Sequence, residues 1–100
     1  MKYIAQVDFP YQGPFGKEMS TAMTDLAQDI AKESGLLWKI WTENEENKSA
    51  GGIYLFDNEA DAKRYVQKHT ARLESFGITD IRAMIFAVNE ELSQITKALL

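Results

Sequence analysis

Hydrophobic and polar positions follow a period of two at the start of the chain and a helical period soon after it. Apolar and polar side chains alternate over residues 2–9, with β-branched and aromatic residues among them, which predicts a strand. Prolines and glycines then interrupt the chain, and over residues 15–32 apolar side chains recur every three or four positions. This spacing predicts an amphipathic helix, and we expect Gly35 to end it in the left-handed conformation that glycine favours after a helix.

The rest of the chain predicts a hairpin, a second long helix and a final strand. Two stretches rich in leucine, isoleucine and aromatic residues flank a polar loop, and a second helical period follows them. The expected elements are strands over residues 36–43, 50–56 and 78–88, a helix that begins at Asp57 or Asn58 and ends before Gly77, and a short C-terminal helix capped by Asn89. The order strand, helix, strand, strand, helix, strand predicts a ferredoxin-like α+β fold with one antiparallel sheet, as a single domain over residues 1–100.

Neither face of the predicted sheet is polar. In the last strand, Ala83 and Ile85 alternate with Met84 and Phe86, so each face presents apolar side chains. Two helices can cover only one face, and an uncovered apolar face of several hundred Å² usually marks an interface. We therefore expect a homodimer in which two sheets pack face to face. The alternative is a monomer whose twisted sheet exposes a few aromatic side chains.

Charge and composition exclude several classes of function. The net charge of −4 argues against nucleic acid or an anionic membrane as a partner. The chain has no cysteine, which excludes disulfides, thiolate catalysis and cysteine-based metal sites. We see no signal-peptide pattern and no apolar run of about 20 residues, so we expect a cytoplasmic protein. Phosphate-binding glycine motifs, a nucleophile elbow and a zinc-binding histidine pair are also missing.

His69 is the only histidine, and it falls at the helical spacing of Tyr65, Val66 and Leu73. That spacing predicts a side chain that points towards the sheet. One interpretation is a half-buried core histidine whose hydrogen bonds are satisfied. The other is a hydrogen-bond donor or an acid–base group in a pocket between helix and sheet, because imidazole titrates near neutral pH.

Aromatic residues are concentrated in the predicted strands and on the sheet-facing side of the second helix. Core packing is one explanation for them. The other is an apolar cavity in which the polar groups of Trp and Tyr hold a flat, hydroxylated aromatic ligand, with room left by an adaptable methionine. The predicted substrate-binding residues are Trp38, Tyr54, Phe56, Tyr65, Met23 and Phe86, and whether Trp38 or Trp41 faces the cavity depends on the register of their strand.

Three stretches of the chain resemble one known family. They are residues 52–57 (GIYLFD), 69–77 (HTARLESFG) and 88–93 (VNEELS), and together they closely resemble the YdhR family of mono-oxygenases. The resemblance implies a dimeric α+β barrel, in which two ferredoxin-like units pack sheet to sheet. It also implies a more remote similarity to the cofactor-independent mono-oxygenases of polyketide antibiotic biosynthesis. Those enzymes oxidise phenols to quinones without flavin, haem or metal, because the reduced aromatic substrate supplies the electrons.

The aromatic residues, His69 and the resemblance together predict a mono-oxygenase that uses molecular oxygen, a small phenol- or quinol-like aromatic substrate and no cofactor. His69 is expected to be the catalytic residue, either as the base that deprotonates a hydroxyl or as the group that positions it. Trp38, Tyr54 and Tyr65 are expected to hold the ring. One alternative is a non-catalytic protein that binds a small molecule. Another is an interaction module whose pocket is vestigial.

Overall fold

Four strands form one antiparallel sheet in the spatial order β2-β3-β1-β4. The computed structural model describes residues 1–100. The strands are β1 (Tyr3–Pro10), β2 (Leu36–Asn44), β3 (Ser49–Phe56) and β4 (Arg82–Ala87). The helices between them follow the predicted order, so the ferredoxin-like α+β fold expected from the sequence is confirmed.

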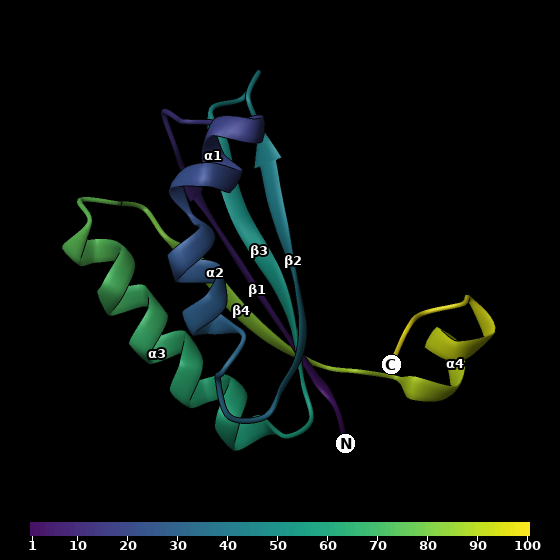
Figure 1. Cartoon of the computed structure of the whole chain (residues 1–100). Helices are drawn as coiled ribbons and strands as arrows, with labels where there is room; N and C mark the ends of the chain where they lie inside the picture. Colours follow the sequence, from purple (N-terminus) through teal and green to yellow (C-terminus); the bar gives the residue numbers. More distant parts are fainter.

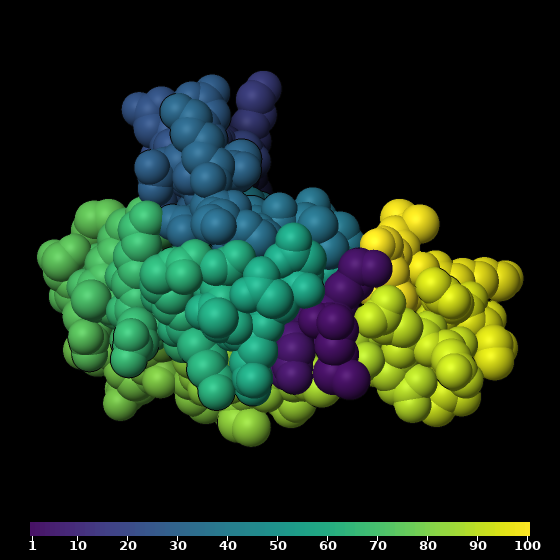
Figure 2. Space-filling model, turned by 90° about the horizontal axis from the view of Figure 1, so that it is seen from below, coloured from purple at the N-terminus to yellow at the C-terminus, as the bar shows by residue number.

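Three helices lie on one side of the sheet and the fourth stands apart. Helices α1 (Gly16–Ala22), α2 (Thr24–Ile30) and α3 (Glu59–Ser75) share a side, whereas α4 (Glu90–Ile95) lies beyond the sheet on the other side (Figure 1). Figure 2 shows the C-terminal segment projecting from the rest of the molecule. None of the helices is both long and apolar enough to span a bilayer.

The single helix predicted over residues 15–32 is wrong, because the structure breaks it at Met23. Met23 has φ −102° and ψ 7°, and it separates α1 from α2. The hydroxyl of Thr24 donates to the carbonyl of Ser20 at 2.7 Å, and the hydroxyl of Ser20 donates to the carbonyl of Gly16 at 3.3 Å. Such bonds to the carbonyl four residues earlier bend helices. The apolar spacing continues through the bend, which is why the pattern gave no sign of it.

Gly35 does not end a helix, whereas Gly77 does. Helix α2 ends at Ile30, and Gly35 lies in a later turn with φ 79°. Gly77 has φ 86° and follows Phe76, the C-cap of α3. Its N–H donates to the carbonyl of Glu74, and the N–H of Ile78 donates to that of Leu73. This pair of bonds is the Schellman arrangement expected for a glycine after a helix.

The core lies between the sheet and helices α1–α3. Side chains from β1 and β3 alternate in direction, and those that point towards the helices are apolar or aromatic. The larger cluster consists of Ala5, Val7, Ile30, Tyr54, Phe56, Ala62, Tyr65 and Leu73. A smaller cluster of Tyr11, Met19 and Ala50 forms where α1 meets the sheet.

A bulge at Leu37 decides which side chains of β2 face the helices. The pairing of β2 with β3 shifts between Leu36 and Trp38, after which Lys39 lies opposite Tyr54. Residues directly opposite in a ladder share a face, so Lys39 faces the helices together with Tyr54. Trp38, one position earlier, faces the other side of the sheet.

Two of the four glycines with positive φ, Gly35 and Gly77, give a matched test of this fold. A Cβ at Gly35 would lie 2.3 Å from Oδ2 and 2.8 Å from Cβ of Asp61, whereas a Cβ at Gly77 would meet nothing within 4 Å. We expect Gly77→Ala to cost about 1–2 kcal/mol, from backbone strain alone. Gly35→Ala should cost at least about 1 kcal/mol more, because the start of α3 must shift as well. Urea denaturation followed by circular dichroism measures both, and equal losses would contradict the packing of Gly35 against Asp61.

Candidate functional site

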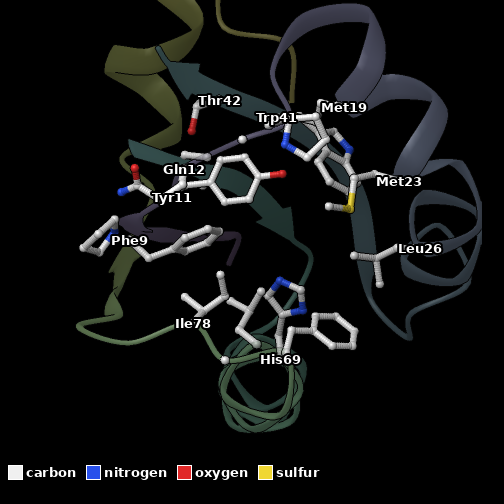
Figure 3. Close-up of a pocket in the computed structure, with 18 of the residues that line it drawn as sticks. Phe9, Tyr11, Gln12, Met19, Met23, Leu26, Trp41, Thr42, His69 and Ile78 are labelled. Carbon is white, nitrogen blue, oxygen red and sulfur yellow. The ribbon is translucent and has the colours of Figure 1, made fainter. Parts of the chain in front are cut away.

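A cavity of about 540 Å³ lies between the helix-covered face of the sheet and helices α1–α3. Its wall is mainly apolar and aromatic, with a few polar atoms, which is the composition typical of a small-molecule site. Figure 3 shows Tyr11, Met23, Trp41 and His69 around a common space, with the ring of Tyr11 extending into it. The walls include members of both core clusters, so the cavity lies where the two clusters meet.

Three of the predicted site residues line this cavity: His69 from α3, Tyr54 from β3 and Met23 from the break between α1 and α2. Two more lie directly behind them. The ring of Tyr65 stacks on that of His69, with centroids 5.0 Å apart and planes 18° apart, and Phe56 lies beside Tyr54 at 6.5 Å. Helical and strand periodicity bring these five together, whereas substrate binding by any of them stays a prediction.

Trp38 and Phe86 do not belong to the cavity, which corrects the prediction that they line it with the others. Nε1 of Trp38 donates to the carbonyl of Leu99 at 2.9 Å, on the side of the sheet away from α1–α3. Phe86 lies opposite Ile4 on that same side and is 46 % exposed. The physical reason is the alternation of side chains along a strand, which the bulge at Leu37 sets for Trp38. Trp41 is the tryptophan that lines the cavity.

His69 is buried and paired with Arg72. Only 3 % of the surface of His69 is exposed to solvent. Its Nδ1 lies 3.0 Å from Nη2 and 3.4 Å from Nε of Arg72. Guanidinium groups only donate, so Nδ1 accepts and a neutral ring carries its proton on Nε2. Burial, with the charges of Lys39 and Arg72, lowers the pKa of His69 to about 3. A base this weak is a poor match for deprotonating a phenol, whereas a hydrogen-bonding role suits it.

Lys39 is a cavity residue that the sequence interpretation missed. Its Nζ lies 3.4 Å from the ring centroid of Trp41 and 4.7 Å from that of Tyr54, close enough for cation–π attraction to both rings. None of the six ion pairs in the protein includes it. Burial, and then the charge of Arg72, lowers the pKa of Lys39 to about 7. The available signal was a lysine in a strand whose other residues are mostly apolar.

Gly52 leaves the space that Lys39 occupies. A Cβ at Gly52 would lie 2.7 Å from Cε of Lys39 and 3.1 Å from the ring of Tyr54. Real Cβ atoms essentially never approach a neighbour so closely, so a larger residue would displace the lysine. A glycine in a strand often marks the close approach of another group, and here that group is the aliphatic part of Lys39.

Tyr11 contributes a buried hydroxyl that has no hydrogen-bond partner. It follows Pro10 at the end of β1, and its ring packs edge-on against Phe9 and Phe15 at centroid distances of 6.1 and 5.4 Å. Burial, and then the charge of Glu43, raises the pKa of Tyr11, so the hydroxyl stays protonated. An unpartnered buried hydroxyl is costly, and a ligand in the cavity could satisfy it. Loop residues lack periodicity, so the sequence gave no signal for it.

A four-stranded sheet in this order, with an aromatic cavity on its helical side, places the protein among the small ferredoxin-like α+β domains. Residues 4–99 match the family described as "Putative mono-oxygenase ydhR", and the chain belongs to that family. The resemblance inferred from three short stretches of sequence is therefore confirmed. A search of the curated proteins finds no match.

Solved structures with the same fold include oxygenases. A "putative antibiotic biosynthesis monooxygenase" from Deinococcus radiodurans is 15 % identical, with a TM-score of 0.58 over 87 % of this chain and 92 % of that one. A variant of SnoaB, a cofactor-independent oxygenase from Streptomyces nogalater, is 14 % identical, with a TM-score of 0.61 over 88 % and 93 %. A structural-genomics protein, YJCS, is 20 % identical, with a TM-score of 0.61 over 88 % and 98 %. At these identities the likeness shows the fold alone.

Burial of His69 has a consequence for stability in acid. Its pKa of about 3 in the folded state lies below the ordinary value, so the unfolded chain binds more protons between those two values. Stability should therefore fall as the pH falls through this window. His69→Gln keeps an acceptor for Arg72 but removes the titration. We expect the wild-type unfolding free energy, relative to that of the variant, to fall by up to about 1.4 kcal/mol per pH unit below about pH 6.

Guanidinium denaturation of both proteins at a series of pH values measures this difference. Other groups titrate in both proteins alike, and the chain has no second histidine, so the difference isolates His69. Parallel pH profiles would contradict the neutral, buried state of the ring.

Proposed function

We propose that the protein is an oxygenase that uses molecular oxygen to oxidise a small aromatic compound of the phenol or quinol type, bound in the cavity beside Tyr54 and His69. The observation that carries the proposal is the cavity itself, because its walls combine aromatic rings with buried polar groups that a hydroxylated ring could engage. Membership of the mono-oxygenase family supports the type of reaction.

The proposed reaction takes its electrons from the substrate. For a 1-naphthol, the ring carbon opposite the hydroxyl loses its hydrogen and gains one oxygen atom, the hydroxyl becomes a carbonyl, and the second oxygen atom leaves as water. The naphthol loses four electrons in all. Two of them reduce the oxygen atom that is built into the product, and the other two reduce the second oxygen atom to water. No flavin, haem or metal is required in this scheme. The protein supplies binding, orientation and the exclusion of water.

Each wall of the cavity has a role in this proposal. The rings of Trp41 and Tyr54 hold the flat substrate, and Met23 adapts to its outline. His69 hydrogen-bonds the substrate hydroxyl as a neutral ring whose orientation is fixed by Arg72. This is the positioning role rather than the basic one, because the low pKa of His69 makes the ring a weak proton acceptor.

Oxygen uptake tests the reaction. We expect at least one member of a panel of 1-naphthols and anthrones to consume oxygen faster in the presence of the protein than in buffer, with protein refolded in chelator and without added cofactor. His69→Ala should lower kcat by about 100-fold because the hydroxyl is no longer oriented. His69→Gln should retain more of the activity, since its amide can still form a hydrogen bond. If every compound reacts at the rate seen in buffer, the oxygenase proposal is wrong.

Binding without turnover is the second candidate function. The weak basicity of His69 favours it, because no strong base is needed in a site that only holds a ligand. The same panel separates the two functions: a binding protein would take up an aromatic compound in the cavity and leave the oxygen concentration unchanged.

We also propose that two copies pair through the uncovered face of the sheet. Ile40, Met84 and Phe86 share that face and are 53, 58 and 46 % exposed. Helix α4 lies on the same side, and Leu92 and Ile95 within it are exposed as well (Figure 1). Exposed apolar side chains gathered on one side of a small domain are typical of an interface between identical copies.

Sedimentation equilibrium tests the pairing. We expect the wild type to be a dimer at micromolar concentration and Phe86→Asp to raise the dissociation constant at least about 100-fold, because a carboxylate would be buried in an apolar interface. Gln67→Asp, on the exposed surface of α3, adds the same charge away from the interface and should leave the dimer intact. A wild type that is monomeric at this concentration would rule the interface out.

A further inference from the structure

The cavity is positively charged inside a protein that is negative overall. The chain has a net charge of −4, yet no aspartate or glutamate lines the cavity, and Lys39 is its only lysine or arginine. Arg72 lies beside it, next to His69, and its own charge is paired with Asp29 at 2.8 Å. A cavity that carries a cation and no carboxylate is arranged to favour an anion.

Lys39 is half-buried and has no ion-pair partner. An ammonium group held away from water is unfavourable unless an opposite charge or several acceptors compensate it. The faces of Trp41 and Tyr54 compensate only in part, since cation–π attraction contributes about 0.5–2 kcal/mol. Lys39 lines the cavity together with both of these rings, so an anion bound there could supply the missing charge.

We propose that the ligand of this cavity is an aromatic compound with an acidic group, bound as its carboxylate or phenolate anion, and that Lys39 binds that group. The inference rests on the proposed function for the aromatic nature of the ligand. The aromatic ring would lie against Trp41 and Tyr54, and the buried hydroxyl of Tyr11 is a second donor in the same cavity. For a phenol, binding as the anion also makes the ring richer in electrons and so easier for oxygen to oxidise.

None of the charged and titratable groups around Lys39 is free to bind the acidic group of the ligand in its place. Tyr54 of β3 stays protonated, because burial raises its pKa to about 12. His69 of α3 is neutral, and Arg72 of the same helix is paired with Asp29 of α2. On β2 itself, Glu43 accepts the backbone N–H of Gly16 at 2.8 Å. No carboxylate is therefore placed to neutralise Lys39 before a ligand arrives.

Two probes of the same shape test the charge requirement: 2-naphthoate, an anion, and 2-naphthamide, its neutral counterpart. Binding to the full chain is followed by calorimetry and by the fluorescence of the two tryptophans, of which Trp41 lines the cavity. At about pH 6 we expect naphthoate to bind at least about tenfold more tightly than the amide, because Lys39 is then protonated. The preference should shrink towards none at about pH 9, as the amine loses its proton. Binding of the amide should not depend on pH.

Variants assign the preference to one residue. Lys39→Met should remove the preference for naphthoate at every pH, and Lys39→Arg should keep it at both pH values because guanidinium stays charged. Gly52→Ala should weaken naphthoate binding without changing any charge, since its methyl group needs the place of Lys39 Cε. Lys48→Met is the matched control: Lys48 also lies over an aromatic ring, that of Phe15 at 5.4 Å, but it is exposed and outside the cavity. This control should bind naphthoate as the wild type does.

A third probe, 2-naphthol, separates the two kinds of anion. If Lys39 stabilises a phenolate, bound naphthol should ionise at a lower pH than free naphthol, seen as absorbance of naphtholate at longer wavelength. If the site prefers a carboxylate, naphthoate binds tightly while naphthol stays neutral. Either result supports an anion site.

Three outcomes would overturn the inference: equal binding of naphthoate and naphthamide by the wild type, an unchanged preference in Lys39→Met, or no binding of naphthoate at millimolar concentration. Oxygen uptake is measured separately, so the two proposals can fail independently. A naphthoate preference without turnover would end the oxygenase proposal and leave the anion site standing. Oxygen uptake by a protein that binds both probes equally would end the anion-site proposal and leave the oxygenase proposal standing.

Discussion

The contact between β3 and α3 is the interaction on which the rest of the structure depends. Tyr54 and Tyr65 meet with ring centroids 4.9 Å apart, and Tyr65 stacks on His69 one turn further along the helix. Large rings on both elements fix how α3 crosses the sheet and form one side of the cavity at the same time. Core and cavity therefore share side chains, so we expect a substitution that loosens this contact to change the stability of the protein and the shape of the cavity together.

Burial of side chains around the contact between β3 and α3 also lowers the pKa of His69 and of Lys39. His69 is neutral because its ring is enclosed by aromatic side chains and lies near two cations, and Lys39 loses much of its basicity for related reasons. The charge of Lys39 lowers the pKa of His69, and the charge of Arg72 lowers the pKa of both groups. A ligand that carries a negative charge would relieve both, which ties the choice of ligand to the packing of the core rather than to any exposed loop.

Periodicity predicted the fold well, because alternation and helical spacing depend on burial and survive local irregularities. What it could not show were features set by single hydrogen bonds or by register. The bend at Met23 comes from hydroxyl groups that bond backwards along the helix, and the facing of Lys39 comes from the bulge at Leu37. The facing of His69 towards the sheet was predicted correctly because this residue lies on a periodic helix. Tyr11 was missed because a loop position carries no period, and its value as a donor appears only when the cavity is seen around it.

Lys39 lies against the aromatic rings of the cavity without an ion-pair partner, and a measured pKa for its amine tests whether this charge is uncompensated. Carbon-13 labelling of lysine side chains, with Lys39→Arg to assign the signal, allows the ε-carbon to be titrated by NMR. We expect a midpoint at about 7 for Lys39 in the free protein, below the ordinary value for a lysine, and a higher midpoint when naphthoate is bound. A midpoint in the ordinary lysine range, unchanged by naphthoate, would contradict this expectation.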